Sequence, residues 1–312
     1  MTEILFTSSK DWDPRLKEVT FGKYKLSSVP RVRESVEDTH ESLILEFEDS
    51  WAEGQVSSNP EREGDYLLSF LSLINAMKVE FNSLKLNNVQ ATLRTRRSSF
   101  LMGRIDSSVN LGELCSKLES LDQDLLRQYL RGCGAYRTAL SLTQDNPTLS
   151  FFLLVTAIEA VSNKAIRSGH QKKDFVEFIL KYLPKSFEDE LGDKDLLSEL
   201  INQAYVMRSN FTHGGTEISI VTLLADRVGR KYIKHMVKDK QICSPSLSWF
   251  AGVVQAVLLK FLLDQEVRER HESILSDLAR EEGVIYLKAA RDIKAGQIVT
   301  TKDLDLDFRE KS

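Results

Sequence analysis

Two side chains near position 210 could carry out proton transfer and charge stabilisation without a metal. Arg208 and His213 lie five positions apart in the segment 196–215, LLSELINQAYVMRSNFTHGG. Histidine has an ordinary pKa of about 6.5, so its imidazole can exchange a proton at neutral pH. Arginine stays charged and offers a planar fork of N–H donors that matches phosphate oxygens. The pair therefore suits a reaction in which one group moves a proton while the other stabilises growing negative charge.

An amphipathic helix is expected to position both side chains. Its apolar residues recur every three or four positions and form one stripe: Leu197, Leu200, Ala204, Met207 and Phe211. Gly214 and Gly215 are expected to end the helix. On an unbroken helix, Arg208 and His213 would lie about 7.5 Å apart along the axis and about 140° around it. They could share one phosphate only if the helix unwound near Asn210 or a second copy of the motif faced the first. The spacing therefore predicts a homodimer.

A second helix supplies the expected partner of Arg208. Residues 148–163 are apolar on nearly every side and follow Pro147, which predicts a helix at the centre of a bundle. Glu159 is the one charged residue inside this segment. An unpaired buried carboxylate is costly, so we expect Glu159 to form an ion pair with Arg208. The pair would either hold Arg208 for chemistry or only fix the register of the two helices, and the sequence favours neither.

The motif R-S-N-F-T-H-G-G, residues 208–215, resembles the R-x4-H motif of HEPN domains, in the ApeA-like subgroup where glycine follows the histidine. HEPN domains are small helical bundles, and many are metal-independent ribonucleases that dimerise so that two motifs face a shared cleft. The resemblance implies that Arg208 and His213 are the catalytic pair. It also implies a match between Glu159, in A-I-E-A, and a glutamate that ApeA-like domains often carry. Many active members have Asn, Asp or His after the arginine; Ser209 stands there in this chain, and serine also occurs in the ApeA-like group.

A HEPN-type reaction would use the 2′-OH of RNA as the nucleophile. His213 would take its proton, and Arg208 would stabilise the charge that grows on the phosphate. The products would be a 2′,3′-cyclic phosphate and a 5′-hydroxyl, and DNA would be inert because it lacks the attacking group. Asn210, Thr212 and Tyr205 are further candidates for hydrogen bonds to the phosphate or its sugar. The resemblance alone suggests a context of bacterial stress response or antiviral defence.

A basic run after the motif is a candidate contact for the RNA backbone. The segment 227–240 includes Arg230, Lys231 and Lys234. These residues would contact phosphates if the run lay at the rim of the cleft. The favoured alternative is a solvated helix face, because Asp226 and Asp239 neutralise part of the run. The whole chain carries a formal charge of -4, so any RNA contact must be local.

Other chemistries find no support in the sequence. The five histidines and three cysteines show no metal-ligand spacing, so we expect no metal and no cofactor. No Walker loop, dinucleotide-binding glycine motif or serine-hydrolase elbow is present. The N-terminus lacks the pattern of a secretion signal, and the most apolar segments, 149–161 and 247–263, fall short of the ~20 residues that a membrane helix needs. We therefore expect a cytoplasmic protein with reduced thiols and no membrane contact.

Three regions are expected along the 312 residues. Residues 1–108 mix strand-like and helical patterns and are predicted to form an α+β N-terminal domain. Residues 109–282 are predicted to form an all-α, HEPN-like helical bundle. Residues 283–312 are expected to form a short β tail. Within that tail, IYLKAARDIKAGQIVTTKDLDL resembles the opening of a SAF (antifreeze-like) domain, of which about half would fit.

Several elements are expected within these regions. Alternating apolar and polar residues predict strands at 22–29 and 42–48. Helical spacing predicts a helix at 61–77, and an apolar helix at 246–265 is expected to close the bundle. Residues 217–223 are expected to be extended.

Two other functions fit the same sequence. The bundle could be a catalytically inactive HEPN module that binds RNA or a protein partner, with Arg208 and His213 as structural polar residues. Alternatively, the SAF-like tail could be a ligand-binding or assembly module, with the bundle as its dimeric mount. RNA cleavage that needs both side chains would separate the first alternative from a nuclease, and deletion from Gly283 onward would test the second.

Overall fold

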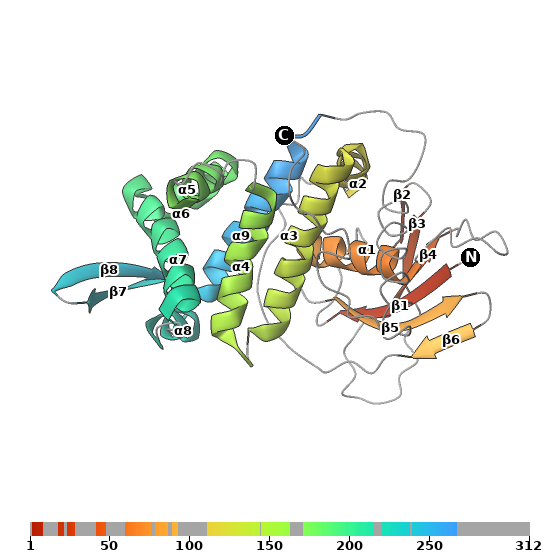
Figure 1. Ribbon diagram of the computed structural model, residues 1–312, viewed down its shortest axis with the longest axis horizontal. Helices are drawn as coiled ribbons and strands as arrows, with labels where there is room; N and C mark the ends of the chain where they lie inside the picture. The colour runs from red at the N-terminus through yellow and green to blue at the C-terminus, as the bar shows by residue number, and fades with distance from the viewer. Residues whose placement is uncertain are drawn as a thin grey trace, which may run out of the picture.

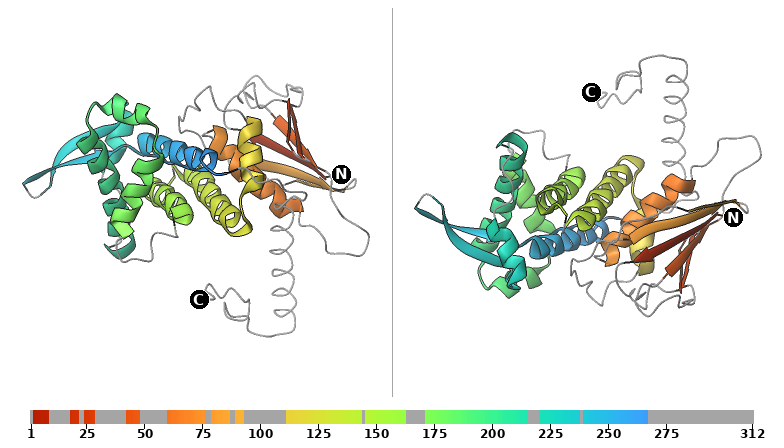
Figure 2. Two further views of the ribbon diagram at one scale, coloured as in Figure 1. Left: turned by 90° about the horizontal axis from the view of Figure 1, so that it is seen from above. Right: turned by 90° about the horizontal axis from the view of Figure 1, so that it is seen from below.

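The protein, seen in a computed structural model, is mostly helical and contains two separate antiparallel sheets (Figure 1). The structure describes these residues: 2–8, 18–21, 24–28, 42–47, 60–75, 79–86, 89–92, 111–143, 145–162, 171–214, 220–237 and 239–266. The SAF-like tail expected at 283–312 lies outside the described residues. The six-stranded sheet lies at one end of the molecule, a β-hairpin at the other, and helices between them (Figure 2).

The N-terminal sheet has the strand order β2-β3-β4-β1-β5-β6. Its strands are β1 (Thr2–Ser8), β2 (Glu18–Phe21), β3 (Tyr24–Ser28), β4 (Ser42–Phe47), β5 (Val79–Leu86) and β6 (Val89–Thr92). All neighbouring pairs are antiparallel, and central β1 pairs Ile4 with Leu45 of β4 and with Leu84 of β5. The strands predicted at 22–29 and 42–48 are confirmed in β3 and β4.

Helix α1 (Pro60–Asn75) lies between this sheet and the other helices (Figure 1). It confirms the helix predicted at 61–77. Nearly all of its side chains from Tyr66 to Ile74 are buried, as expected for a helix covered on both sides. One apolar core therefore continues from Leu26 of β3 through α1 into the helices that follow.

The C-terminal part is built from eight helices within the described residues. They are α2 (Leu111–Ser120), α3 (Gln123–Leu142), α4 (Pro147–Ser162), α5 (Gln171–Tyr182), α6 (Lys185–Leu191), α7 (Lys194–Gly214), α8 (Ile220–Arg227) and α9 (Leu247–Leu263). The apolar helices α4 and α9 pack against each other, with Phe151 and Phe250 stacked at 4.8 Å between ring centroids. Local capping sets where helices begin: Asp122 accepts a hydrogen bond from Leu125 N at 2.8 Å, and Ser246 accepts one from Trp249 N at 3.2 Å.

The expectation of an all-α bundle is wrong in one element. Strands β7 (Tyr232–Val237) and β8 (Lys240–Pro245) form an antiparallel hairpin between α8 and α9. Asp239 has a φ of 62° in the turn, a left-handed conformation that aspartate tolerates better than most residues. The segment YIKHMV, residues 232–237, does not alternate apolar and polar residues, so it lacks the pattern by which a half-buried strand is recognised in a sequence.

The extended conformation expected at 217–223 is also wrong where the structure describes it. Residues from Ile220 onward belong to helix α8. Its Asp226 carboxylate accepts hydrogen bonds from Leu247 N at 2.9 Å and Ser248 N at 3.0 Å, at the start of α9. A carboxylate at a helix N-terminus is favourable, so contacts distant in sequence outweigh the local β preference of Ile220 and its neighbours.

Candidate functional site

Arg208 lies near the end of α7, and its side chain reaches helix α4. Its Nη2 donates a hydrogen bond to Glu159 Oε2 at 2.9 Å. The two side chains are 21% and 17% exposed, so the pair is mostly buried but not sealed. The predicted ion pair is therefore present.

Aromatic rings complete the surroundings of the guanidinium. Arg208 Cζ lies 5.6 Å from the ring centroid of Phe152 and 5.9 Å from that of Tyr205, both within cation–π range. Phe211 packs against Phe152, with 5.6 Å between ring centroids. Within the part of the chain that the structure describes, no acceptor reaches the buried Nε of Arg208. The guanidinium is thus held by one carboxylate and two rings, and its exposed fraction comes from atoms other than Nε.

Of these aromatic neighbours, Tyr205 was a candidate site residue from the sequence and Phe211 was placed in the apolar stripe of the helix, whereas Phe152 was not singled out. Phe152 lies seven positions before Glu159, which places both on one face of α4. Phe211 lies three positions after Arg208 and Tyr205 three before it, so they are its neighbours on α7. Helical spacing alone would have grouped these rings with the ion pair, because residues three, four or seven apart share a helix face.

The buried pair shifts the titration of its carboxylate. Burial raises the pKa of Glu159 above its ordinary value, while the charge of Arg208 and its hydrogen bond pull that pKa back down. Burial and then the Glu159 charge also raise the pKa of Tyr205, although Arg208 lowers it. Tyr205 therefore keeps its phenolic proton near neutral pH and can act at this site as a donor, not as a base.

Helix α7 runs without a break from Lys194 to Gly214. It ends where Gly214 and Gly215 predicted, and it does not unwind near Asn210. His213 belongs to its last turn, and the position of its side chain lies outside the described residues. Since five residues of continuous helix correspond to about 140° of rotation, positions 208 and 213 lie on different faces of α7.

Two other polar residues near the end of α7, Thr212 and Asn210, were also candidates for hydrogen bonds to a ligand. Thr212 Oγ1 donates a hydrogen bond to the Arg208 carbonyl at 3.0 Å, so its hydrogen is used within the helix. Asn210 is exposed to solvent. Of these two residues, Asn210 has the side chain better placed to donate a hydrogen bond to a ligand.

The candidate RNA-binding residues lie at the β-hairpin and its base. Arg230 and Lys234 are exposed, and Lys231 forms an ion pair with Glu190 at 2.6 Å. Lys234 pairs in register with Cys243, whose backbone N–H donates a hydrogen bond to Glu199 of α7 at 3.2 Å.

Glu199 precedes Arg208 by nine residues, which on a helix means about 13.5 Å along the axis and about 180° around it. Within one chain, the hairpin therefore packs on the face of α7 opposite the one that carries Arg208. The structure brings Arg208, Glu159 and Tyr205 together and places the basic hairpin residues apart from them.

No group of three metal-ligating side chains occurs among the described residues. Cys115, Cys133 and Cys243 are buried free thiols. Burial raises the pKa of Cys115 to about 12 and that of Cys133 further, so neither thiol would ionise to act as a nucleophile. Within the described residues, no helix is long and apolar enough to cross a membrane.

Comparison of this chain with protein-family models, with curated proteins and with solved structures found no match. The geometry around Arg208 and the motif that contains it are therefore the observations from which a function can be inferred.

Proposed function

We propose that this chain is a metal-independent endoribonuclease of the HEPN type, with Arg208 and His213 as its catalytic pair. The ion pair between Arg208 and Glu159 supports the proposal most directly. It fixes a guanidinium near the end of α7, five positions before a histidine, and leaves 21% of the arginine side chain exposed. A partly exposed, oriented cation and a histidine five positions away on the same helix are the two kinds of group that the cleavage of RNA through its 2′-OH requires.

Each nearby group has a defined task in this reaction. Glu159 and the rings of Phe152 and Tyr205 orient the guanidinium, whose exposed N–H groups would bind the phosphate oxygens. His213 would take the 2′-OH proton, and the oxygen so activated would attack the adjacent phosphorus. The bond from phosphorus to the 5′-oxygen would break, and that oxygen would take a proton from water, leaving a 2′,3′-cyclic phosphate and a 5′-hydroxyl.

A homodimer would bring the two catalytic side chains to one phosphate. Because α7 is continuous, positions 208 and 213 of one chain lie on different faces of the helix, and a second copy would supply the missing partner from the opposite side. Half-buried apolar side chains lie close to the ion pair in sequence and could form the interface: Phe152, Leu153, Met207 and Phe211.

The first experiment is an RNA cleavage assay in EDTA with structured and unstructured RNA. The wild type is expected to cut RNA but not DNA of the same sequence, and its products should carry 2′,3′-cyclic phosphates. Arg208→Ala and His213→Ala should each lower the rate by at least about 100-fold, as for loss of a general base or of a charge-stabilising group. Arg127→Ala is the control, because this arginine is also ion-paired, with Asp124 at 3.2 Å on the surface of α3.

Two outcomes would refute the proposal that the protein is a nuclease. One is the absence of cleavage in purified protein and in cells, where expression of the wild type should arrest growth and either substitution should relieve the arrest. The other is cleavage that survives both substitutions, since it would come from another site or a contaminant. A role in stress response or antiviral defence is part of the proposal and is tested by the growth experiment.

Dilution tests the shared site. Activity per chain should fall as the protein is diluted through its dimer dissociation constant, which light scattering measures at the same concentrations. A monomer with undiminished activity per chain would contradict a site made by two subunits.

A binding module without catalysis is the second candidate. One observation favours it: the charge of Arg208 is already matched by Glu159, which reduces its attraction for a phosphate. This candidate predicts RNA or partner binding that persists in His213→Ala and produces no cleavage.

A further inference from the structure

The β7–β8 hairpin has one edge that faces the rest of the protein and one edge that is open. The outer edge of β8 faces α7, because Cys243 N donates a hydrogen bond to Glu199 Oε1 at 3.2 Å. Among the described strands, β7 pairs with β8 alone. The two strands extend beyond α7 and away from the other helices (Figure 1, Figure 2). The outer edge of β7 is therefore open along the part of the hairpin that projects.

The register of the hairpin shows which backbone groups lie on this open edge. In an antiparallel pair, residues that bond across the ladder alternate with residues whose N–H and C=O groups point outward. Cys243 bonds outward to Glu199, so its register partner Lys234 also points outward. The Ser246 N–H donates inward to the Lys231 carbonyl at 2.8 Å, which fits the same alternation. Three residues of β7 therefore direct their N–H and C=O groups away from β8: Tyr232, Lys234 and Met236.

These outward groups form no hydrogen bond within the part of the chain that the structure describes. The side chains beside them are exposed at Lys234 and at Met236, the latter by 64%. A projecting hairpin of two strands is only marginally stable by itself, and a third strand would support it. An edge that offers both donors and acceptors matches another strand, whereas the phosphates of a nucleic acid would match only the donors.

The charge of the hairpin selects the kind of strand that could bind. Arg230, Lys234 and Lys240 are exposed and form no ion pair with any described residue, while the turn contributes one acidic residue, Asp239. Lysine on an edge strand deters pairing with a like-charged strand. A second copy of β7 would bring its own Lys234 to the same edge, so an acidic segment is favoured over a second copy.

An acidic segment with the pattern of a strand occurs in this chain, outside the described residues. Residues 303–308 read D-L-D-L-D-F, a strict alternation of acidic and apolar residues that is typical of a strand with one apolar face. Asp303 follows Glu266, the last described residue, by 37 positions (303 − 266). A chain of that length can extend about 120 Å. The way back along α9 and the hairpin is shorter, about 25 Å and about 20 Å, so the segment can reach β7.

We propose that residues 303–308 of this chain add a third strand to the open edge of β7. The backbone of the segment would bond to the outward N–H and C=O groups of β7. Its aspartates would lie on the face that carries Lys234, and its apolar side chains on the face that carries Ile233, which is half-buried. The docked segment would neutralise Lys234 and keep other acidic partners from the hairpin. The proposal is independent of RNA cleavage.

Residue-resolved hydrogen exchange of the full chain tests this docking. In the wild type, the amides of Lys234 and Met236 should exchange slowly although they do not bond to β8. Charge reversal of the segment by Asp303→Lys, Asp305→Lys and Asp307→Lys together should speed their exchange at least about 10-fold, because the edge loses its acceptors. The neighbouring amides of β7, at residues 233 and 235, bond to β8 and should change less.

Two further variants assign the effect to the segment and to its charge. Asp277→Lys with Glu281→Lys and Glu282→Lys makes the same change of charge outside the segment and should leave the exchange as in the wild type. Lys234→Glu should speed exchange at Met236, because the segment would meet a like charge. Lys234→Glu combined with the reversed segment should restore slow exchange, because the two charges are again opposite.

Carbodiimide cross-linking provides an independent readout on the unmodified chain. This reagent joins an amine directly to an adjacent carboxylate, so the wild type should give links from Lys234 to an aspartate of residues 303–307. A mixture of 15N-labelled and unlabelled protein shows whether each link lies within one chain. We expect links within one chain.

Three results would overturn the proposal. One is fast exchange at Lys234 and Met236 in the wild type, and slowing of that exchange by added RNA would identify the edge as an RNA contact instead. Another is slow exchange that persists in the reversed segment, which would mean that a different strand, such as that of a second copy, covers β7. The third is a set of links that form only between chains.

Discussion

Arg208 has two properties that an arginine at a reactive site needs. Its ion pair with Glu159 and its contacts with Phe152 and Tyr205 hold the guanidinium in one place, and 21% of its side chain remains exposed to solvent. Burial of the pair also has a cost, because both charges lose hydration. The pKa of Glu159, raised by burial and lowered by Arg208, reflects this balance.

Replacement of Arg208 by methionine should make stability more dependent on pH. Without the charge and hydrogen bond of Arg208, the pKa of Glu159 should rise further above its ordinary value of about 4.5. When the pKa of a carboxyl is higher in the folded protein than in the unfolded chain, the protein loses stability as the pH rises from the lower pKa to the higher one. The deficit of Arg208→Met relative to wild type should therefore be small below pH 4.5 and grow toward neutral pH, to about 2–3 kcal/mol. Urea unfolding at several pH values measures it.

Arg127→Met is the control for this prediction. Its partner Asp124 is largely exposed, so its loss should change stability little at any pH. A deficit of Arg208→Met that stays constant across the pH range would show that Glu159 is not the ionised partner of Arg208.

At the scale of elements, the approach of α3 to α4 depends on a glycine. Gly132 faces α4 so closely that a Cβ would lie 2.9 Å from Ala157 O and 3.0 Å from Val161 Cγ2. Ser150 on α4 donates a hydrogen bond to the Ala139 carbonyl of α3 at 2.8 Å, which also ties the two helices together. Since α4 carries Glu159, this packing helps to set where the carboxylate meets Arg208.

Gly132→Ala should therefore destabilise the protein, and Gly134→Ala should stabilise it. The first change forces backbone and side-chain shifts that cost about 1–3 kcal/mol, partly offset by the better helix propensity of alanine. The second adds a methyl group whose nearest neighbour is Ser69 Oγ at 4.0 Å, an ordinary contact, and should gain about 0.5–1 kcal/mol. Urea unfolding of both variants measures the difference, and equal effects of the two substitutions would contradict the close packing of α3 on α4.

At the scale of the whole molecule, a buried glutamine connects α9 with α1, the helix that lies beside the N-terminal sheet. Gln255 of α9 donates from Nε2 to the carbonyls of Leu73 at 2.8 Å and Ile74 at 3.2 Å, in the last turn of α1. Carbonyls at the end of a helix lack partners within it, so this side chain caps α1 from the other part of the molecule.

Gln255→Leu should weaken this connection. The two buried carbonyls would lose their donor, which we expect to cost about 1–3 kcal/mol, and backbone amides of α1 should exchange hydrogen faster than in the wild type. Gln265→Leu is the control, because Gln265 follows α9 directly and its Nε2 donates only to the Phe261 carbonyl of that helix among the contacts described. Unchanged exchange in α1 upon loss of the Gln255 amide would mean that apolar packing alone holds the helix in place.

Some features of the protein follow from the sequence because they depend on neighbours along the chain. The period of apolar residues and the closing glycines predicted helix α7 and its end at Gly214. The single charge in an apolar helix predicted the pair of Glu159 with Arg208, because a buried carboxylate needs a cation. The spacing of apolar residues likewise predicted strands β3 and β4 and helix α1.

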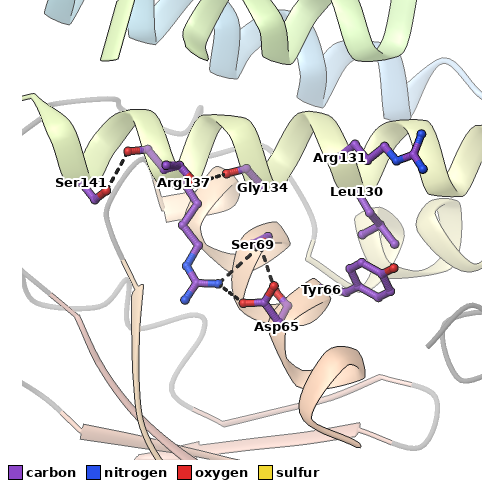
Figure 3. A pocket seen from close by; sticks show the side chains of 9 residues that line it. Asp65, Tyr66, Ser69, Leu130, Arg131, Gly134, Arg137 and Ser141 are labelled. Atoms are coloured by element: carbon purple, nitrogen blue, oxygen red, sulfur yellow. Dashed lines mark hydrogen bonds and ion pairs between the residues drawn. The ribbon is translucent and has the colours of Figure 1, made fainter. Parts of the chain in front are cut away.

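Other features depend on which distant segments meet, and tertiary structure alone decided them. Helix α8 is anchored through its Asp226, which accepts a hydrogen bond from Leu247 N of α9, and the β7–β8 hairpin through Cys243 N, which donates to Glu199 of α7. These contacts outweigh local preference. A surface pocket that Gly134 lines exists only because α1 packs against α3 (Figure 3). A spacing of three or four residues between apolar positions shows which face of a helix is buried. Which element packs on that face depends on burial and hydrogen bonding across the whole chain.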